Sequence, residues 1–154
     1  MAEIILSNRM QALTDMVTPG TVITDVGCDH GFVSVYLVQK GISPRVIAMD
    51  VRSGPLEHAR EHIREYGLED RIETRLSDGL HSLKTGEAAG MICAGMCGPL
   101  IEKILTEGRE QAKGFRELIL QPQSEIPHFR TFLMEEGYLL MDENLSLIHI
   151  SEPT

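Results

Sequence analysis

Short β-rich runs alternate with helical patterns along almost the whole chain, and this alternation constrains the fold most strongly. The expected strands are residues 21–26, 46–51, 71–76, 89–94 and 118–121, and a run that begins at 138–141. The expected helices cover residues 6–17, 32–39, 53–67, 100–105 and 126–136. Nearly continuous apolar strands separated by helices predict an α/β fold with a doubly wound, mostly parallel sheet. Ligands bind such sheets at the carboxyl ends of the strands, so functional residues are expected there.

The size and composition suit one domain. The chain has 154 residues, of which 42% are hydrophobic and 24% are charged, close to the averages for globular proteins. We expect one domain over residues 1–145, followed by an atypical tail at 146–154. No apolar run approaches the roughly 18 residues that span a bilayer, and the first residues lack the signals of a secretory peptide. We therefore expect a cytoplasmic protein, with a monomer as the default state.

The charge balance is acidic. The formal net charge is −9, and the 14 Lys and Arg residues are spread along the chain. Phosphate contacts require basic side chains, so composition alone argues against nucleic acid as a partner.

Cysteine and histidine residues form no metal-binding pattern in the sequence. Cys28, Cys93 and Cys97 lack the paired spacing of a structural zinc site, and we expect all three to be buried or partly buried. His58 and His62 lie one turn apart on an expected helix, but the sequence suggests no third ligand. We expect a solvated face at that position, no cluster among the six histidines, and no bound metal.

The strongest functional signal is the segment DVGCDHG at residues 25–31, which closes the first strand and opens a helix. Gly27 and Gly31 allow a ligand to approach the backbone closely. A dinucleotide site would have G-x-G-x-x-G here, but Asp29 stands where its second glycine is expected. The carboxylates of Asp25 and Asp29 would repel a diphosphate and attract a cation. S-adenosylmethionine, with a sulfonium and an ammonium, suits this loop; an acidic structural turn is the alternative.

Carboxylates also follow the next two strands. Asp50, before Val51, can accept hydrogen bonds from both ribose hydroxyls of an adenosine. Asp78 can accept from an adenine amino group, with Gly79 and Leu80 lining the ring. Asp and Gly are also common in ordinary turns. Asp50 and Asp78 therefore indicate a cofactor site only in combination with the loop at residues 25–31.

The fourth strand runs into AGMCGP at residues 94–99. Gly95 and Gly98 leave a gap against which a flat base could lie beside the methyl donor. A tight strand-to-helix turn with Pro99 at the first helical position is the alternative, and Met96 could serve packing alone.

The segments LSNRM, DVGCDHG, AGMCG and LILQPQ together resemble the TrmK family of bacterial tRNA (adenine-N1)-methyltransferases, from about Leu6 to about Asn144. The resemblance implies a Rossmann-like class I methyltransferase fold, S-adenosylmethionine as cofactor, and an adenine at position twenty-two of tRNA as substrate. That adenine must be unpaired or extruded to present N1. Two features depart from the family: Cys97 replaces a usual glycine, and no helical hairpin follows Asn144. We therefore expect a fold truncated at its C-terminal end.

The resemblance also assigns roles to the candidate residues. Those expected to bind the cofactor are Asp25, Gly27, Cys28, Asp29, His30, Gly31, Asp50, Val51, Asp78, Gly79, Leu80 and Ala94. Those expected to act in catalysis are Asp29, Ala94, Gly95 and Met96, while Ala94 to Gly98 would face the substrate base. Gln121 and Pro122 would help to shape the pocket.

Three alternatives stay open. A nicotinamide-dependent dehydrogenase shares the architecture, but the chain lacks its glycine fingerprint and an evident catalytic pair. A methyltransferase acting on a small molecule or a protein would need the same motifs at residues 25–31, at Asp50 and at Asp78. A non-catalytic module that binds S-adenosylmethionine is the third.

Overall fold

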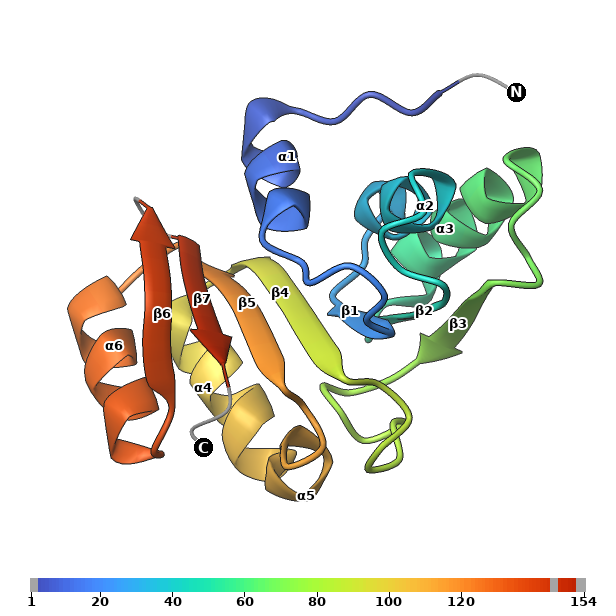
Figure 1. Cartoon of the computed structure of the whole chain (residues 1–154). Helices are drawn as coiled ribbons and strands as arrows, with labels where there is room; N and C mark the ends of the chain where they lie inside the picture. Colours follow the sequence, from blue (N-terminus) through green and yellow to red (C-terminus); the bar gives the residue numbers. More distant parts are fainter. Residues whose placement is uncertain (1–2, 145–146, 152–154) are drawn as a thin grey trace.

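The computed structural model describes residues 3–144 and 147–151, which build one seven-stranded sheet with helices on both faces (Figure 1). The strands are β1 (Ile23–Val26), β2 (Val46–Asp50), β3 (Ile72–Leu76), β4 (Gly90–Met96), β5 (Glu117–Pro122), β6 (Leu139–Asn144) and β7 (Leu147–Ser151). Their order in the sheet is β3-β2-β1-β4-β5-β7-β6. β1 to β5 are parallel, and β7 pairs antiparallel with both β5 and β6. The predicted α/β, mostly parallel sheet is confirmed.

Two groups of helices cover the two faces of the sheet (Figure 1). On one face lie α1 (Asn8–Asp15), α2 (Phe32–Gln39) and α3 (Ser53–Glu65), and on the other lie α4 (Gly98–Glu107), α5 (Arg109–Ala112) and α6 (Ile126–Glu135). Each group packs on its own apolar cluster, and every residue of β1, β2 and β5 is buried. Burial on both faces explains why these strands are almost continuously apolar.

Local signals set most helix ends. Ser7 caps α1 by accepting a hydrogen bond from the Met10 backbone N–H at 3.3 Å. Pro99 lies in the first turn of α4, where its missing N–H costs nothing. α3 begins at Ser53, where the expected helix begins, and the residue at its capping position, Arg52, makes no side-chain capping hydrogen bond.

The end of the chain differs most from the sequence prediction. The residues expected to be an atypical tail include β7, which lies between β5 and β6 in the sheet. The four-residue helix α5 was also not predicted. In the described part of the chain, no helix is both long enough and apolar enough to cross a membrane.

Candidate functional site

The loop after β1 has a backbone conformation that suits glycine. Gly27 and Gly31 have φ values of +75° and +79°, and Asp29 between them has φ +52°. This left-handed region costs most side chains about 1–2 kcal/mol, and Asp is among those that tolerate it best. The N–H groups of Gly27 and Cys28 donate to the Met49 carbonyl at 2.8 and 2.9 Å. The loop is therefore anchored to β2, the neighbouring strand.

Three carboxylates crowd around this loop. Asp25 is 5% exposed and accepts a hydrogen bond from Ser34 Oγ at 2.8 Å. Burial raises the pKa of Asp25 to about 6; the Ser34 bond opposes this rise, and the charges of Asp50 and Asp29 add to it. A cation would relieve the repulsion among the three carboxylates, whereas a phosphate would increase it.

We expect Asp25→Asn to remove a pH-dependent loss of stability. Because folding raises the pKa of Asp25 from 3.8 to about 6, its contribution is complete below the lower value and is lost as pH rises through the higher one. The loss amounts to about 3 kcal/mol of unfolding free energy between about pH 4 and about pH 8. Urea unfolding across this range should show it in the wild type and not in the variant.

The matched control is Asp70→Asn, which changes an exposed carboxylate after α3. It should keep the pH dependence of the wild type. Equal pH dependence for Asp25→Asn and the wild type would contradict the raised pKa of the buried Asp25 carboxyl group.

Asp50 is the last residue of β2. It is 2% exposed, and both oxygens of its carboxylate accept hydrogen bonds. Its Oδ2 accepts from the Asp29 backbone N–H at 3.1 Å, and its Oδ1 from the Arg52 backbone N–H at 2.9 Å. The exposed Arg52 guanidinium adds an ion pair, with Nε 3.3 Å from Oδ1, and its bond to Asp50 raises the pKa of Arg52. The backbone donors hold the carboxylate in place, while the Arg52 side chain covers oxygen atoms that a ligand could use.

A cavity of about 500 Å³ lies beyond the carboxyl ends of the strands. It lies beside β1 and β4, where the strand order reverses, the usual ligand position in such sheets. Its volume is within the range of small-molecule sites. Its lining includes seven residues expected to bind the cofactor: Gly27, Asp29, Asp50, Val51, Asp78, Gly79 and Ala94. We call it the larger cavity.

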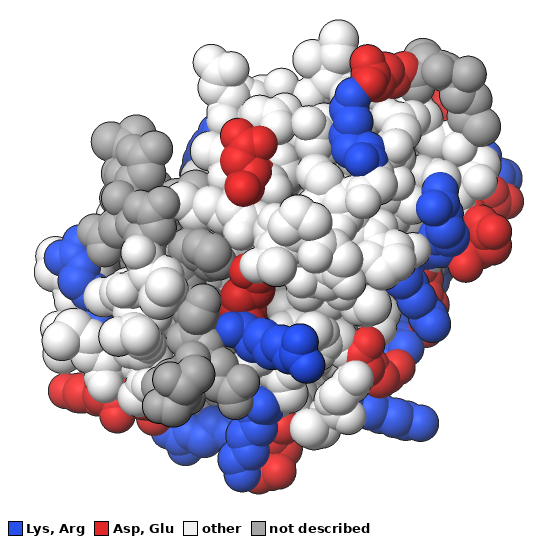
Figure 2. Space-filling view, in the orientation of Figure 1, with Lys and Arg blue, Asp and Glu red and all other residues white. Residues whose placement is uncertain are grey.

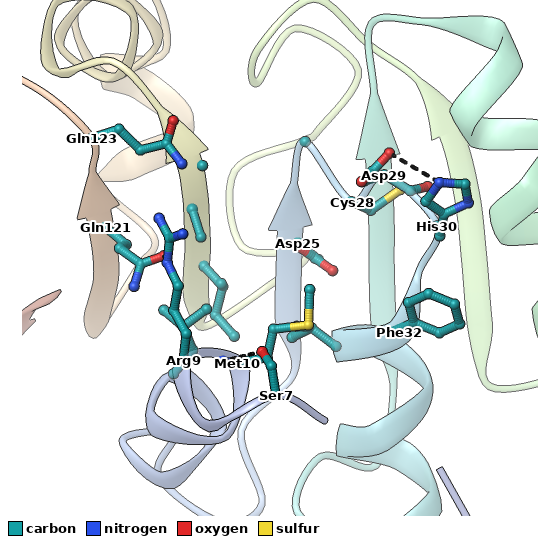
Figure 3. Close-up of a pocket in the computed structure, with 16 residues that line it drawn as sticks. Ser7, Arg9, Met10, Asp25, Cys28, Asp29, His30, Phe32, Gln121 and Gln123 are labelled. Carbon is teal, nitrogen blue, oxygen red and sulfur yellow. Dashed lines mark hydrogen bonds and ion pairs between the residues drawn. The ribbon is translucent and has the colours of Figure 1, made fainter. Parts of the chain in front are cut away.

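A second cavity, of about 270 Å³, lies under α1 and is called the smaller cavity here. Its polar lining comes from three directions (Figure 3). α1 supplies Arg9, whose Nε donates to Gln121 Oε1 of β5 at 2.8 Å. The loop after β1 supplies Asp29 and His30, whose Oδ1 and Nε2 atoms lie 3.8 Å apart, and Gln123 follows β5.

The two cavities share one stretch of wall. Gly27, Asp29, Ala94 and Gly95 line both. Gly95 has φ +80°, and a Cβ built on it meets no atom within 4 Å, so it borders open space. Met96 lines the larger cavity and packs over Gly27, where a Cβ would lie 2.4 Å from Met96 Cε. The candidates for catalysis Asp29, Ala94, Gly95 and Met96 are therefore brought together.

Some candidates have other surroundings. Leu80 is 1% exposed in the core and lies outside the lining of both cavities. The gap expected at Gly98 is filled, because a Cβ there would lie 2.6 Å from the Ser124 carbonyl oxygen. Gly31 also serves packing, since its Cβ would lie 3.1 Å from Ala59 Cβ on α3. Cys28 and His30 line the smaller cavity rather than the larger one.

Two predictions about side chains are wrong. Cys97 is exposed, whereas Cys28 and Cys93 are buried as expected; burial raises the pKa of both buried thiols. The histidines do form a cluster, because His30, His58 and His62 gather with their ring centroids 5.1–6.0 Å from His30.

Sequence reasoning missed several residues of the site. Arg9 and Ser7 lie in the LSNRM segment, but the position of α1 over the smaller cavity could not be derived from its helical pattern. Gln123 is the last residue of the LILQPQ segment and lines the smaller cavity. Arg52 follows Asp50 directly, and only the folded chain shows its contact with two carboxylates, Asp50 and Asp29.

Comparisons with known proteins agree with this geometry. The family model described as a methyltransferase domain matches residues 6–149. The tRNA (adenine(22)-N(1))-methyltransferase of Bacillus subtilis (strain 168) is 37% identical over 143 residues, 93% of this chain and 60% of that protein. The chain thus spans about 60% of the length of this curated relative.

Two solved structures also match. Streptococcus pneumoniae Sp1610 in complex with S-adenosyl-L-methionine has a TM-score of 0.86 and 30% identity, covering 96% of this chain and 72% of that one. M. capricolum TrmK in complex with S-adenosyl-homocysteine has a TM-score of 0.84 and 25% identity, covering 96% of this chain and 69% of that one. With its Rossmann-like sheet and the motifs around both cavities, the chain belongs to the methyltransferase domain family and, within it, to the TrmK family.

Proposed function

We propose that this chain binds S-adenosylmethionine in the larger cavity and transfers its methyl group to N1 of an adenine in tRNA. The observation that carries this proposal is the shared wall of Gly27, Asp29, Ala94 and Gly95 between two cavities. A methyl donor on one side and an acceptor on the other would meet at that wall. The curated relative is a tRNA (adenine(22)-N(1))-methyltransferase, which supports the choice of acceptor.

The larger cavity suits a cationic nucleoside. Asp29, Asp50 and Asp78 line it together with glycine backbone, and S-adenosylmethionine has no phosphate that these carboxylates would repel. Asp50 would accept from the ribose hydroxyls and Asp78 from the adenine amino group. Of the loop after β1, Gly27 and Asp29 would lie near the methionine end. The bound donor would supply an electrophilic methyl group on its sulfonium.

The smaller cavity would receive the adenine. Its N1 lone pair forms the new bond to the methyl carbon, and the electrons of the broken C–S bond stay on sulfur. No proton has to leave in this step, so the site needs alignment rather than a strong base, and alignment can contribute roughly 7–11 kcal/mol. A paired adenine hides N1, so the base must be unpaired or extruded, at a cost of a few kcal/mol. Such a substrate would place the protein in the cytoplasm.

The test is incorporation of labelled methyl groups into bacterial tRNA that lacks this modification, with mapping of the product nucleotide. We expect 1-methyladenine as the product. Labelling of proteins or small molecules but not tRNA would favour a different methyltransferase. Binding of S-adenosylmethionine without any transfer would favour a non-catalytic module.

We expect Asp29→Gly to lower turnover at least about tenfold, the loss of one positioning contact, without loss of stability. Asp29 adopts φ +52°, which glycine adopts freely, and its side chain borders both cavities. The substitution removes the carboxylate while relaxing the backbone. Single-turnover methylation and thermal unfolding measure the two effects.

The matched variant is Asp29→Asn, which also tolerates this backbone region but keeps the shape of the side chain. If the negative charge of Asp29 is required, methyl transfer by Asp29→Asn should be as slow as by Asp29→Gly. If only hydrogen bonding is required, the turnover of Asp29→Asn should be closer to that of the wild type. Wild-type turnover in Asp29→Gly would remove Asp29 from the mechanism.

A further inference from the structure

Four rings form a cluster at the base of α2 and along α3. His30 stacks on Phe32 with centroids 5.9 Å apart, and Phe32 stacks on His62 at 4.7 Å. His58 meets His30 edge-on at 5.1 Å. His62 Nδ1 lies 2.8 Å from the His30 carbonyl oxygen, which fixes its ring. These four residues are called the ring cluster.

The ring cluster extends outward from the smaller cavity. His30 and Phe32 line that cavity, while His58 is exposed and outside it. The side chain of His30 is 44% exposed, so the cluster leads from the cavity lining to the surface. A nucleotide next to an adenine held in the smaller cavity would lie against these rings.

A metal does not explain the cluster. Among the residues whose side chains are described, Asp78, His81 and Glu107 form the one group of three or more metal-type ligands with donor atoms within 4.8 Å of one another. The three clustered histidines do not bring their nitrogens that close together. Phe32 stacks face to face on His30 and on His62, and His58 meets His30 edge to face, which is the geometry of aromatic packing.

The charge distribution makes such a surface useful. The chain carries a net charge of −9, and on the face in Figure 2 Lys and Arg side chains lie among Asp and Glu around a largely uncharged centre. A protein without a strong basic footprint gains less from phosphate contacts. Unstacked RNA bases bind instead by stacking on Phe and His rings.

Resting on the proposed function, we propose that the ring cluster is a stacking surface for a base adjacent to the target adenine, with His58 as its outermost ring. The cluster would thus hold RNA by base stacking and keep the extruded adenine from returning to its helix. This role involves no contact with the methyl donor.

The test compares His58→Ala with His58→Phe in the whole chain. His58→Ala should weaken tRNA binding about tenfold, because stacking of one base on a ring contributes roughly 1–3 kcal/mol. His58→Phe keeps a ring and should bind within about twofold of the wild type. Affinity for S-adenosylmethionine should stay unchanged in both. His128→Ala, which removes an exposed histidine on α6, is the matched control and should bind tRNA normally.

A fluorescent base gives a second readout. With 2-aminopurine beside the target adenine, binding to the wild type should quench its fluorescence, and His58→Ala should reduce the quenching. Wild-type affinity in His58→Ala would overturn the inference, as would equal weakening in His58→Phe and His58→Ala or no tRNA binding by the wild type. If tRNA binds in a manner that depends on His58 but receives no methyl group, the inference stands and the proposed function fails.

Discussion

Gly95→Ala is expected to lower the turnover of methyl transfer about 100-fold while leaving the affinity for S-adenosylmethionine within a few-fold of the wild type. Gly95 lines both cavities, and a Cβ on it would enter open space at their shared wall. A methyl group there would separate donor and acceptor, and a displacement of about 1 Å can cost about 100-fold in rate. Single-turnover kinetics with saturating tRNA would measure the effect.

A second glycine separates this effect from backbone strain. Gly95 has φ +80° and Gly41 has φ +71°, and a Cβ at either position meets no atom within 4 Å. Both alanine variants should therefore lose a similar amount of stability, but Gly41 lies outside the lining of both cavities. Only Gly95→Ala should slow methyl transfer. Equal slowing in both variants, or in neither, would contradict the position of the reaction at the shared wall.

Asp50→Ala is expected to weaken binding of S-adenosylmethionine at least about 100-fold, because hydrogen bonds to a charged group contribute roughly 1.5–3 kcal/mol each and those from two ribose hydroxyls would be lost. The backbone N–H groups of Asp29 and Arg52 hold this carboxylate at the wall of the larger cavity. Calorimetric titration measures the affinity, and thermal unfolding confirms that the variant is folded.

The matched variant for Asp50→Ala is Arg52→Ala. The guanidinium is 63% exposed and covers oxygen atoms of Asp50, and such exposed ion pairs contribute at most about 1 kcal/mol. Its removal should leave the affinity unchanged or raise it by up to about fivefold. Weaker binding in Arg52→Ala would show that Arg52 itself contacts the ligand, and unchanged binding in Asp50→Ala would remove Asp50 from the site.

The sequence predicts the parallel half of the fold well and its C-terminal half less well. Strands β1, β2 and β5 are buried on both faces and so carry a strong apolar signal. β7 is a five-residue antiparallel strand, and α5 is a single four-residue turn after Gly108. Elements this short have too few residues to show a period, and β7 becomes a strand only through its pairing with β5 and β6.

The candidate site could be predicted only where its residues are close together in the sequence. Residues within one loop, such as Asp25, Gly27 and Asp29, could be grouped from the sequence because one turn holds them together. Contacts between distant elements could not be predicted. Arg9 and Gln121 are 112 residues apart and share a hydrogen bond. His58 and His62 cluster with His30 only because α3 packs beside the loop after β1.

The surroundings of individual glycine and leucine residues could not be predicted from the sequence either. A glycine in a turn can open space for a ligand or allow close packing, and the sequence alone does not distinguish them. Gly95 borders open space, whereas Gly98 lies against the Ser124 carbonyl. Leu80 follows Asp78 by two residues, yet it turns into the core under α4, where Gly108 lies against it.

The central claim is that the acidic loop after β1 selects a cationic methyl donor over a diphosphate. Calorimetric titration of the same sample with S-adenosylmethionine and then with NAD tests it most directly. We predict one saturable site for S-adenosylmethionine and no binding of NAD. Saturable binding of NAD that displaces S-adenosylmethionine would contradict the claim, and with it the assignment of both cavities.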